Sequence, residues 1–140
     1  MAGSTQYLTW VGIIFHVVAV VTRGMSVSRF PMGNMYEFVI TSTAVTMVAA
    51  AVIIQRRGWH TTWPWLLAPN IVLLFLAATV LYAAAAPLVP ALQSFWYPFH
   101  VSTVSVGASI GLISGMFSLL YLLRICLLYT SDAADDLLCV

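Results

Sequence analysis

The chain has 140 residues, of which 62% are hydrophobic and 6% are charged, and its formal net charge is +1. A soluble domain carries about 25% charged residues and cannot hide this much apolar surface, so the composition indicates an integral membrane protein. The few basic residues also exclude nucleic-acid binding, which requires clustered Lys and Arg side chains.

Four apolar runs, at 8–22, 36–54, 65–86 and 101–124, predict membrane-spanning helices, since a span needs about 17–25 apolar residues. The N-terminus has no basic stretch and no clear cleavage site, so we expect the first run to be retained as a helix. The connections are short, and no alternating strand pattern appears. We therefore predict an all-α integral membrane protein with four transmembrane helices in one bundle, formed by residues 1–125.

The arginines predict how this bundle is oriented in the membrane. Arg56 and Arg57 follow the second run and Arg124 ends the fourth, which indicates that these ends are cytoplasmic. The N-terminus is then also cytoplasmic, and the connections 23–35 and 87–99 face outward.

Two further arginines, Arg23 and Arg29, lie on this outer side, where the positive-inside rule does not explain them. They could bind the propionates of a haem through bidentate hydrogen bonds. The alternative is an internal ion pair with Glu37. Glu37 lies close to the start of a predicted helix, where the positive end of the helix dipole stabilises its negative charge. The two roles are compatible for one arginine each.

His100 lies at the expected outer end of the fourth run, directly after an aromatic group that includes Trp96. Neutral imidazole ligates haem iron, and an interfacial aromatic patch gives a macrocycle an apolar wall. We therefore take His100 as a candidate axial ligand and Trp96 as a candidate wall of the same site. The alternative is a histidine that only snorkels at the membrane surface.

His16 lies inside the first run, seven residues before Arg23 and on nearly the same helix face. An ionisable group within a span is expensive and is a functional hypothesis by default. His16 could ligate iron or bond a neighbouring helix, and both interpretations stay open. His60, near the cytoplasmic arginines, is expected to be a solvated loop residue.

Small residues recur every four positions along the fourth run, at Thr103, Gly107, Gly111 and Gly115. A doubled G-x-x-x-G pattern lets another helix or a flat ligand approach the backbone closely. We expect helix packing along this face.

The last fifteen residues differ from the run before them, and they hold every Asp of the chain. Residues 126–136 back-translate to a string that resembles the mosaic-end adapter of transposase-based sequencing libraries. We therefore interpret 126–140 as adapter read-through, leave both cysteines out of the functional argument, and expect the native sequence to continue beyond Ile125. The alternative is a genuine acidic cytoplasmic tail.

Two segments carry a family resemblance. The first is Thr22-Arg-Gly24 followed by Arg29-Phe-Pro-Met-Gly-Asn-Met-Tyr-Glu-Phe38, and the second is Pro90-Ala-Leu-Gln-Ser94 with Trp96 and His100-Val-Ser-Thr103. They resemble the loop-to-helix signature, and the segment ahead of the external haem site, of the CcsA/ResC group of c-type cytochrome biogenesis proteins (CcsB-type in actinobacteria).

The resemblance implies the integral subunit of a system II cytochrome c synthase in the bacterial cytoplasmic membrane. Such a subunit works with a ResB-type membrane subunit, moves haem b outward, and presents it to an apocytochrome c with a CxxCH motif. His100 matches the first of the family's two external histidines. The second histidine and the tryptophan-rich WWD segment do not occur in this sequence, so the resemblance implies an inactive fragment of a larger polytopic protein.

The family mechanism requires no catalytic residue from this chain, because the apocytochrome supplies both thiols; the protein orients and ligates the haem. Two other functions stay open. One is a haem-b or quinone-binding membrane anchor of a respiratory complex, with His16 and His100 as a ligand pair. The other is a purely structural membrane subunit.

Overall fold

The computed structural model of the chain describes residues 2–137. Its elements are α1 (Ala2–Val27), α2 (Met35–Arg57), the 3-10 turn η1 (His60–Thr62), α3 (Trp63–Thr79), the 3-10 turn η2 (Pro90–Leu92) and α4 (Tyr97–Leu137). The described residues contain no strand, and they form four helices that are long and apolar enough to span a membrane. The predicted all-α architecture of four membrane-spanning helices is confirmed.

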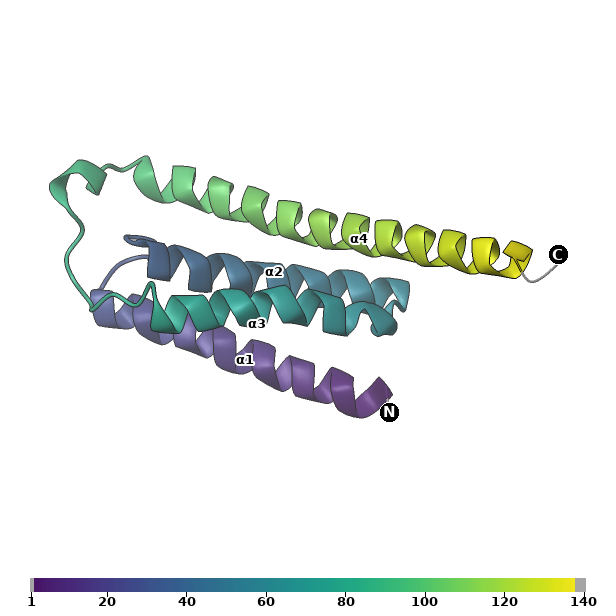
Figure 1. Cartoon of the computed structure of the whole chain (residues 1–140). Coiled ribbons are helices and arrows are strands. Elements are labelled where there is room, and N and C mark those ends of the chain that lie inside the picture. Colours follow the sequence, from purple (N-terminus) through teal and green to yellow (C-terminus); the bar gives the residue numbers. More distant parts are fainter. Residues whose placement is uncertain (1, 138–140) are drawn as a thin grey trace.

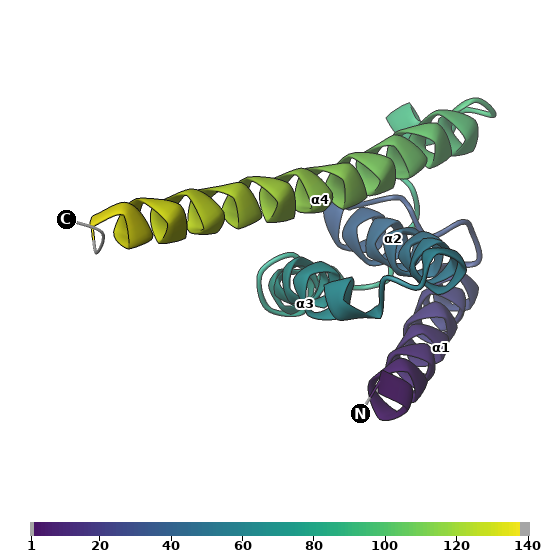
Figure 2. The same cartoon turned by 90° about the vertical axis from the view of Figure 1, so that its right-hand side faces the viewer.

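Successive helices run in opposite directions, so the chain crosses the bundle four times (Figure 1). Helix α2 is central, because it packs against each of the other three helices. Viewed along the bundle, α1 and α3 lie on one side of α2 and α4 lies on the other (Figure 2). The connection from α1 to α2 and the long connection from α3 to α4 lie at the same end of the molecule (Figure 1).

The hydrophobic core follows from this arrangement, since α2 packs against three helices. Its side chains Met47, Ala50, Ala51 and Ile54 are buried, and all four belong to the main core cluster. The other helices contribute the remaining members, Ile13, Trp63, Leu66 and Ile113. Burial on α1 and α4 is much sparser, and their large apolar side chains mostly face outward, as expected for helices in contact with lipid.

Both ends of α2 are fixed by local sequence signals. Asn34 is the N-cap, and its side-chain oxygen accepts a hydrogen bond from the Glu37 amide at 2.8 Å. At the other end Gly58 adopts the left-handed conformation, with φ 70°, and its amide bonds to the Ile54 carbonyl. Arg57 lies in the last turn, where the negative end of the helix dipole stabilises its positive charge.

Helix α3 ends at Thr79, whereas the apolar run predicted a helix up to residue 86. The carbonyls of Ala83 and Ala86 accept hydrogen bonds from arginine side chains instead, at 2.8 and 3.2 Å. Pro87 also disfavours a helical conformation for the residue before it. The predicted end of this helix was therefore wrong. The carbonyls of Ala83 and Ala86 would have no partner in a longer helix, because the residues four positions on are Pro87 and Pro90, which lack an N–H group, and the arginines supply the missing donors.

Helix α4 extends beyond the predicted 101–124 at both ends and includes residues 126–137 of the predicted adapter tail; residues 138–140 of that tail lie outside the described residues. It packs on α2 through a face that contains the buried Ser105, Ser109 and Ile113. The glycines at 107, 111 and 115 lie on the opposite face, and an added Cβ at each would contact nothing within 4 Å. Packing within the described bundle therefore does not use the glycine face.

Candidate functional site

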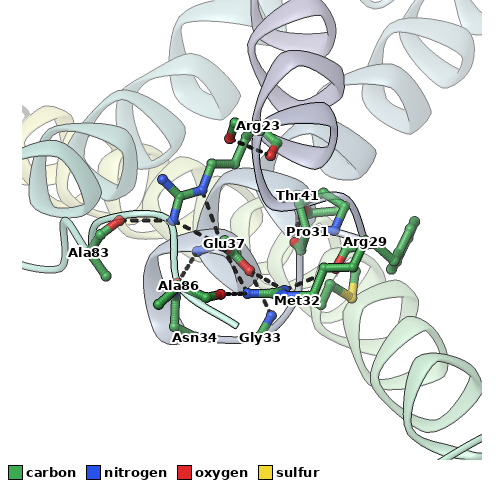
Figure 3. Close-up of polar contacts among 12 residues, drawn as sticks. Arg23, Arg29, Pro31, Met32, Gly33, Asn34, Glu37, Thr41, Ala83 and Ala86 are labelled. Atoms are coloured by element: carbon green, nitrogen blue, oxygen red, sulfur yellow. Dashed lines mark hydrogen bonds and ion pairs between the residues drawn. The ribbon is translucent and has the colours of Figure 1, made fainter. Parts of the chain in front are cut away.

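A buried carboxylate organises the end of the bundle where the α1–α2 and α3–α4 connections lie. Glu37 lies in the first turn of α2, is 0% exposed, and pairs with both Arg23 and Arg29 at 2.9 and 2.8 Å (Figure 3). Its Oε2 atom also accepts a hydrogen bond from the Gly33 amide at 2.7 Å. The internal pair that the sequence offered as one alternative is therefore present, and it includes both arginines.

The two guanidinium groups share the carboxylate in different ways. Arg23 donates from Nε and Nη2 to the same Oε1 atom, at 3.1 and 2.9 Å, and its guanidinium also lies over the Tyr36 ring at 5.2 Å. Arg29 bridges both carboxylate oxygens, at 2.8 Å to Oε2 and 3.4 Å to Oε1. A carboxylate removed from water is tolerable only with such close, charge-assisted partners.

The same arginines fasten the α3–α4 connection to the cluster. Arg23 donates to the Ala83 carbonyl, and Arg29 donates to the Ala86 carbonyl (Figure 3). These bonds join residues that are 60 and 57 positions apart in the sequence. The Glu37 cluster, which we define as Arg23, Arg29 and Glu37, thus holds together α1, the start of α2 and the segment after α3.

The start of α4 is tied to this end of the bundle by further contacts. The Tyr97 hydroxyl donates a hydrogen bond to the Met32 carbonyl, and Ser105 contacts the Met32 sulfur at 3.7 Å. Met32 is 4% exposed and directly precedes Gly33, whose amide bonds to the Glu37 carboxylate. A continuous set of contacts therefore runs from the Glu37 cluster to the first turn of α4.

His100 lies in this first turn of α4, three residues after Tyr97. It is exposed, and it lines a cavity of about 360 Å³ together with Tyr97, residues 32–34 of the loop and Met35 at the start of α2. Its ring makes no hydrogen bond to any described residue, so both ring nitrogens are available. Among the residues whose side chains the structure describes, no group of three or more His, Cys, Asp or Glu could hold a metal, so His100 offers one ligand and not a protein-only metal site.

The aromatic group beside His100 forms an exposed apolar surface. Phe95, Trp96 and Phe99 contact one another, with ring centroids 5.4 to 6.2 Å apart, and they are 77%, 72% and 57% exposed. The three rings lie within five residues of His100 in the sequence, but none of them lines the cavity that His100 lines. The residues present therefore offer one axial ligand for a haem, His100, and a separate exposed aromatic surface that an apolar macrocycle can contact.

His16 is separated from this site. Its Nε2 atom bonds to the Ile40 carbonyl at 2.9 Å and approaches the Thr43 hydroxyl at 3.5 Å, so it joins α1 to α2. It lines a different cavity from His100, and α4 lies across α2 from α1 (Figure 2). The bond to a neighbouring helix is thus present, and the structure does not bring His16 and His100 together as a ligand pair.

The sequence interpretation missed several polar side chains in the membrane interior. Ser42 and Ser105 share a hydrogen bond of 3.1 Å between α2 and α4, and Ser109 donates to the Ser42 carbonyl at 3.0 Å. Asn70 of α3 is 2% exposed. A signal was available, since hydroxyls four residues apart on a span mark one helix face.

Comparison with known proteins yields no relative: no protein-family model, no curated protein and no solved structure matches this chain.

Proposed function

We propose that the chain is a haem-handling membrane subunit of cytochrome c assembly, which presents haem at the outer membrane face for attachment to an apocytochrome c. The observation that carries the proposal is the placement of His100: an exposed imidazole with free nitrogens that lines a cavity of about 360 Å³, directly after an exposed aromatic segment of the chain. The resemblance of the two sequence segments, one of which includes His100, to the CcsA/ResC group also supports it.

The Glu37 cluster has a supporting role in this proposal. Two arginines against one carboxylate leave one net positive charge, and this surplus favours a nearby anion such as a haem propionate. The cluster also fixes the loop 30–34, part of which lines the cavity beside His100. In this proposal His100 would ligate the haem iron, the exposed aromatic rings would cover part of the macrocycle, and the Glu37 cluster holds the loop in position. The bound haem would supply the vinyl groups to which the thiols of the apocytochrome add.

The proposal also includes an orientation and partners. The ends that carry Arg56, Arg57 and Arg124 are cytoplasmic under the positive-inside rule, which puts His100 on the outer face of a bacterial cytoplasmic membrane. A ResB-type subunit completes the complex. The chain acts as the part that holds haem, and cytochrome c synthase activity belongs to the whole assembly.

The test is the haem content of the chain co-expressed with a ResB-type subunit. Since even a change beside a metal ligand lowers affinity about 10–100-fold, His100→Ala should lower the co-purified haem by at least about tenfold. His60→Ala is the matched control, because His60 is exposed at the opposite end of the bundle. Equal haem content in wild type and His100→Ala would contradict the proposal and favour a structural subunit.

A further inference from the structure

Three aromatic side chains at the start of α4, Phe95, Trp96 and Phe99, form a surface that the rest of the bundle does not cover. Each is more than half exposed, and the three rings lie against one another. The indole N–H of Trp96 makes no hydrogen bond to any described residue. We call these three side chains the ring cluster, and it combines an apolar surface with one unused polar donor.

The ring cluster lies at the level where two membrane-spanning helices begin. The Tyr97 hydroxyl donates to the Met32 carbonyl, which holds the first turn of α4 beside the loop before α2. Helices α2 and α4 therefore start at the same level of the bundle (Figure 1). Because both are apolar enough to span a membrane, this level is where the hydrocarbon core gives way to the lipid headgroups. Trp side chains are enriched at that boundary, since the apolar ring faces the acyl chains while the N–H bonds to polar groups.

The ring cluster is also continuous with an exposed apolar stripe of α4. Val106 and Ile110 follow Phe99 by seven and eleven residues, so the three side chains lie on nearly the same helix face. Val106 and Ile110 are 49% and 62% exposed. Residues 58–123 include no Asp, Glu, Lys or Arg, so this whole surface can lie against lipid without removing a charge from water. The continuity favours lipid over a soluble protein as the occupant of the ring cluster.

We infer that the ring cluster is a membrane anchor, in which the three rings lie among the headgroups and upper acyl chains of the leaflet at this end of the bundle. The Trp96 N–H donates to lipid carbonyl or phosphate oxygens. The anchor fixes the end of the α3–α4 connection at the membrane surface, while the Glu37 cluster holds the earlier part of this connection. The inference does not rest on haem handling, and rings at this level remain accessible to an apolar macrocycle that arrives through the bilayer.

The experiment locates single nitroxide labels on the full chain in lipid nanodiscs, after both cysteines are replaced by serine. Labels are attached to Phe95→Cys and to Phe99→Cys, each of which leaves two rings in place. Ser94→Cys is the matched control, because Ser94 is also exposed and directly precedes the cluster but is polar. Power saturation compares collisions with oxygen, which concentrates in hydrocarbon, and with a nickel chelate, which stays in water. The ratio of oxygen to nickel collisions should be at least about threefold higher at positions 95 and 99 than at position 94.

Fluorescence tests the cluster without a label. Trp96→Phe keeps an aromatic ring, so the difference between its emission and that of the wild type isolates Trp96. Lipids brominated near the headgroup end of the acyl chains should quench this contribution by more than about half. The contribution of Trp63, obtained in the same way from Trp63→Phe, should be quenched much less, because Trp63 is buried in the protein. Equal nickel accessibility at positions 94, 95 and 99 would overturn the inference, and so would a Trp96 contribution that brominated lipids leave unquenched.

Discussion

Glu37 has no contact with solvent, and its two oxygens accept from both guanidinium groups and from one backbone amide. Glu37→Gln keeps the size of the side chain but leaves two arginines facing a neutral partner. Because breaking a buried ion pair from one side is strongly destabilising, we expect the free energy of unfolding in detergent to fall by about 3–5 kcal/mol. Arg56→Gln, which changes an exposed charge at the other end of α2, should alter it by less than about 0.5 kcal/mol. A Glu37→Gln protein as stable as the wild type would show that the cluster does not hold this end together.

Gly33 tests the same cluster through its geometry. An added Cβ at this position would lie 2.5 Å from both Nη atoms of Arg29, which are already bonded to Glu37 and to the Ala86 carbonyl. Gly33→Ala should therefore displace the guanidinium and lower the free energy of unfolding by about 1–3 kcal/mol.

The control is Gly107→Ala, since an added Cβ there would meet nothing within 4 Å. Alanine also has the higher helix propensity, so this variant should be stabilised by up to about 1 kcal/mol. Equal effects of the two substitutions, in chemical denaturation under the same conditions, would refute the proposed clash with Arg29.

At the scale of the helices, α2 and α4 are joined by serine hydroxyls as well as by apolar packing. Ser109 donates to the Ser42 carbonyl across the interface and to the Ser105 carbonyl within its own helix. Hydrogen bonds between membrane helices contribute about 0.6 kcal/mol on average and up to about 1.7 kcal/mol. Ser109→Ala should lower the free energy of unfolding within this range, whereas Ser118→Ala, on the exposed part of α4, should leave it unchanged. The reverse ranking would rule out a stabilising role for the serine contacts.

The helices themselves could be predicted because each depends on a local apolar run, and in a bilayer the backbone of such a run must satisfy its own hydrogen bonds. The end of α3 could not be predicted in this way. The segment that follows Thr79 bonds to Arg23 and Arg29, which reach the carbonyls of Ala83 and Ala86 from the other connection. A contact between residues almost sixty positions apart leaves no signal in the local sequence pattern.

The same distinction applies to the candidate site. The ion pair of Arg29 and Glu37 could be offered as an alternative from the sequence, since the two residues are only eight positions apart and Glu37 lies at the start of a predicted helix. The position of His100 beside the loop could not be predicted from the sequence, because it depends on the hydrogen bond from Tyr97 to the Met32 carbonyl. Asn70 was missed because a single amide in an apolar run shows nothing of its burial.

For the whole molecule, the arrangement of the helices puts both long connections at one end, and the arginines predict that this end faces outward. The prediction can be tested after both cysteines are replaced by serine. A new cysteine at Ser94, in the α3–α4 connection, should react with a membrane-impermeant maleimide on intact cells. A cysteine at Thr61, which is also exposed but lies at the other end, should react only after permeabilisation. The opposite pattern would put His100 on the cytoplasmic side.

The most direct measurement of the central claim is a spectroscopic titration of the purified chain, in nanodiscs, with haemin. Coordination by an imidazole shifts the main absorption band of the haem, so the wild type and His60→Ala should both show a saturable shift that His100→Ala lacks. If His100→Ala binds haemin with the same spectrum and affinity as the wild type, then His100 is not the ligand and the proposed haem site is wrong.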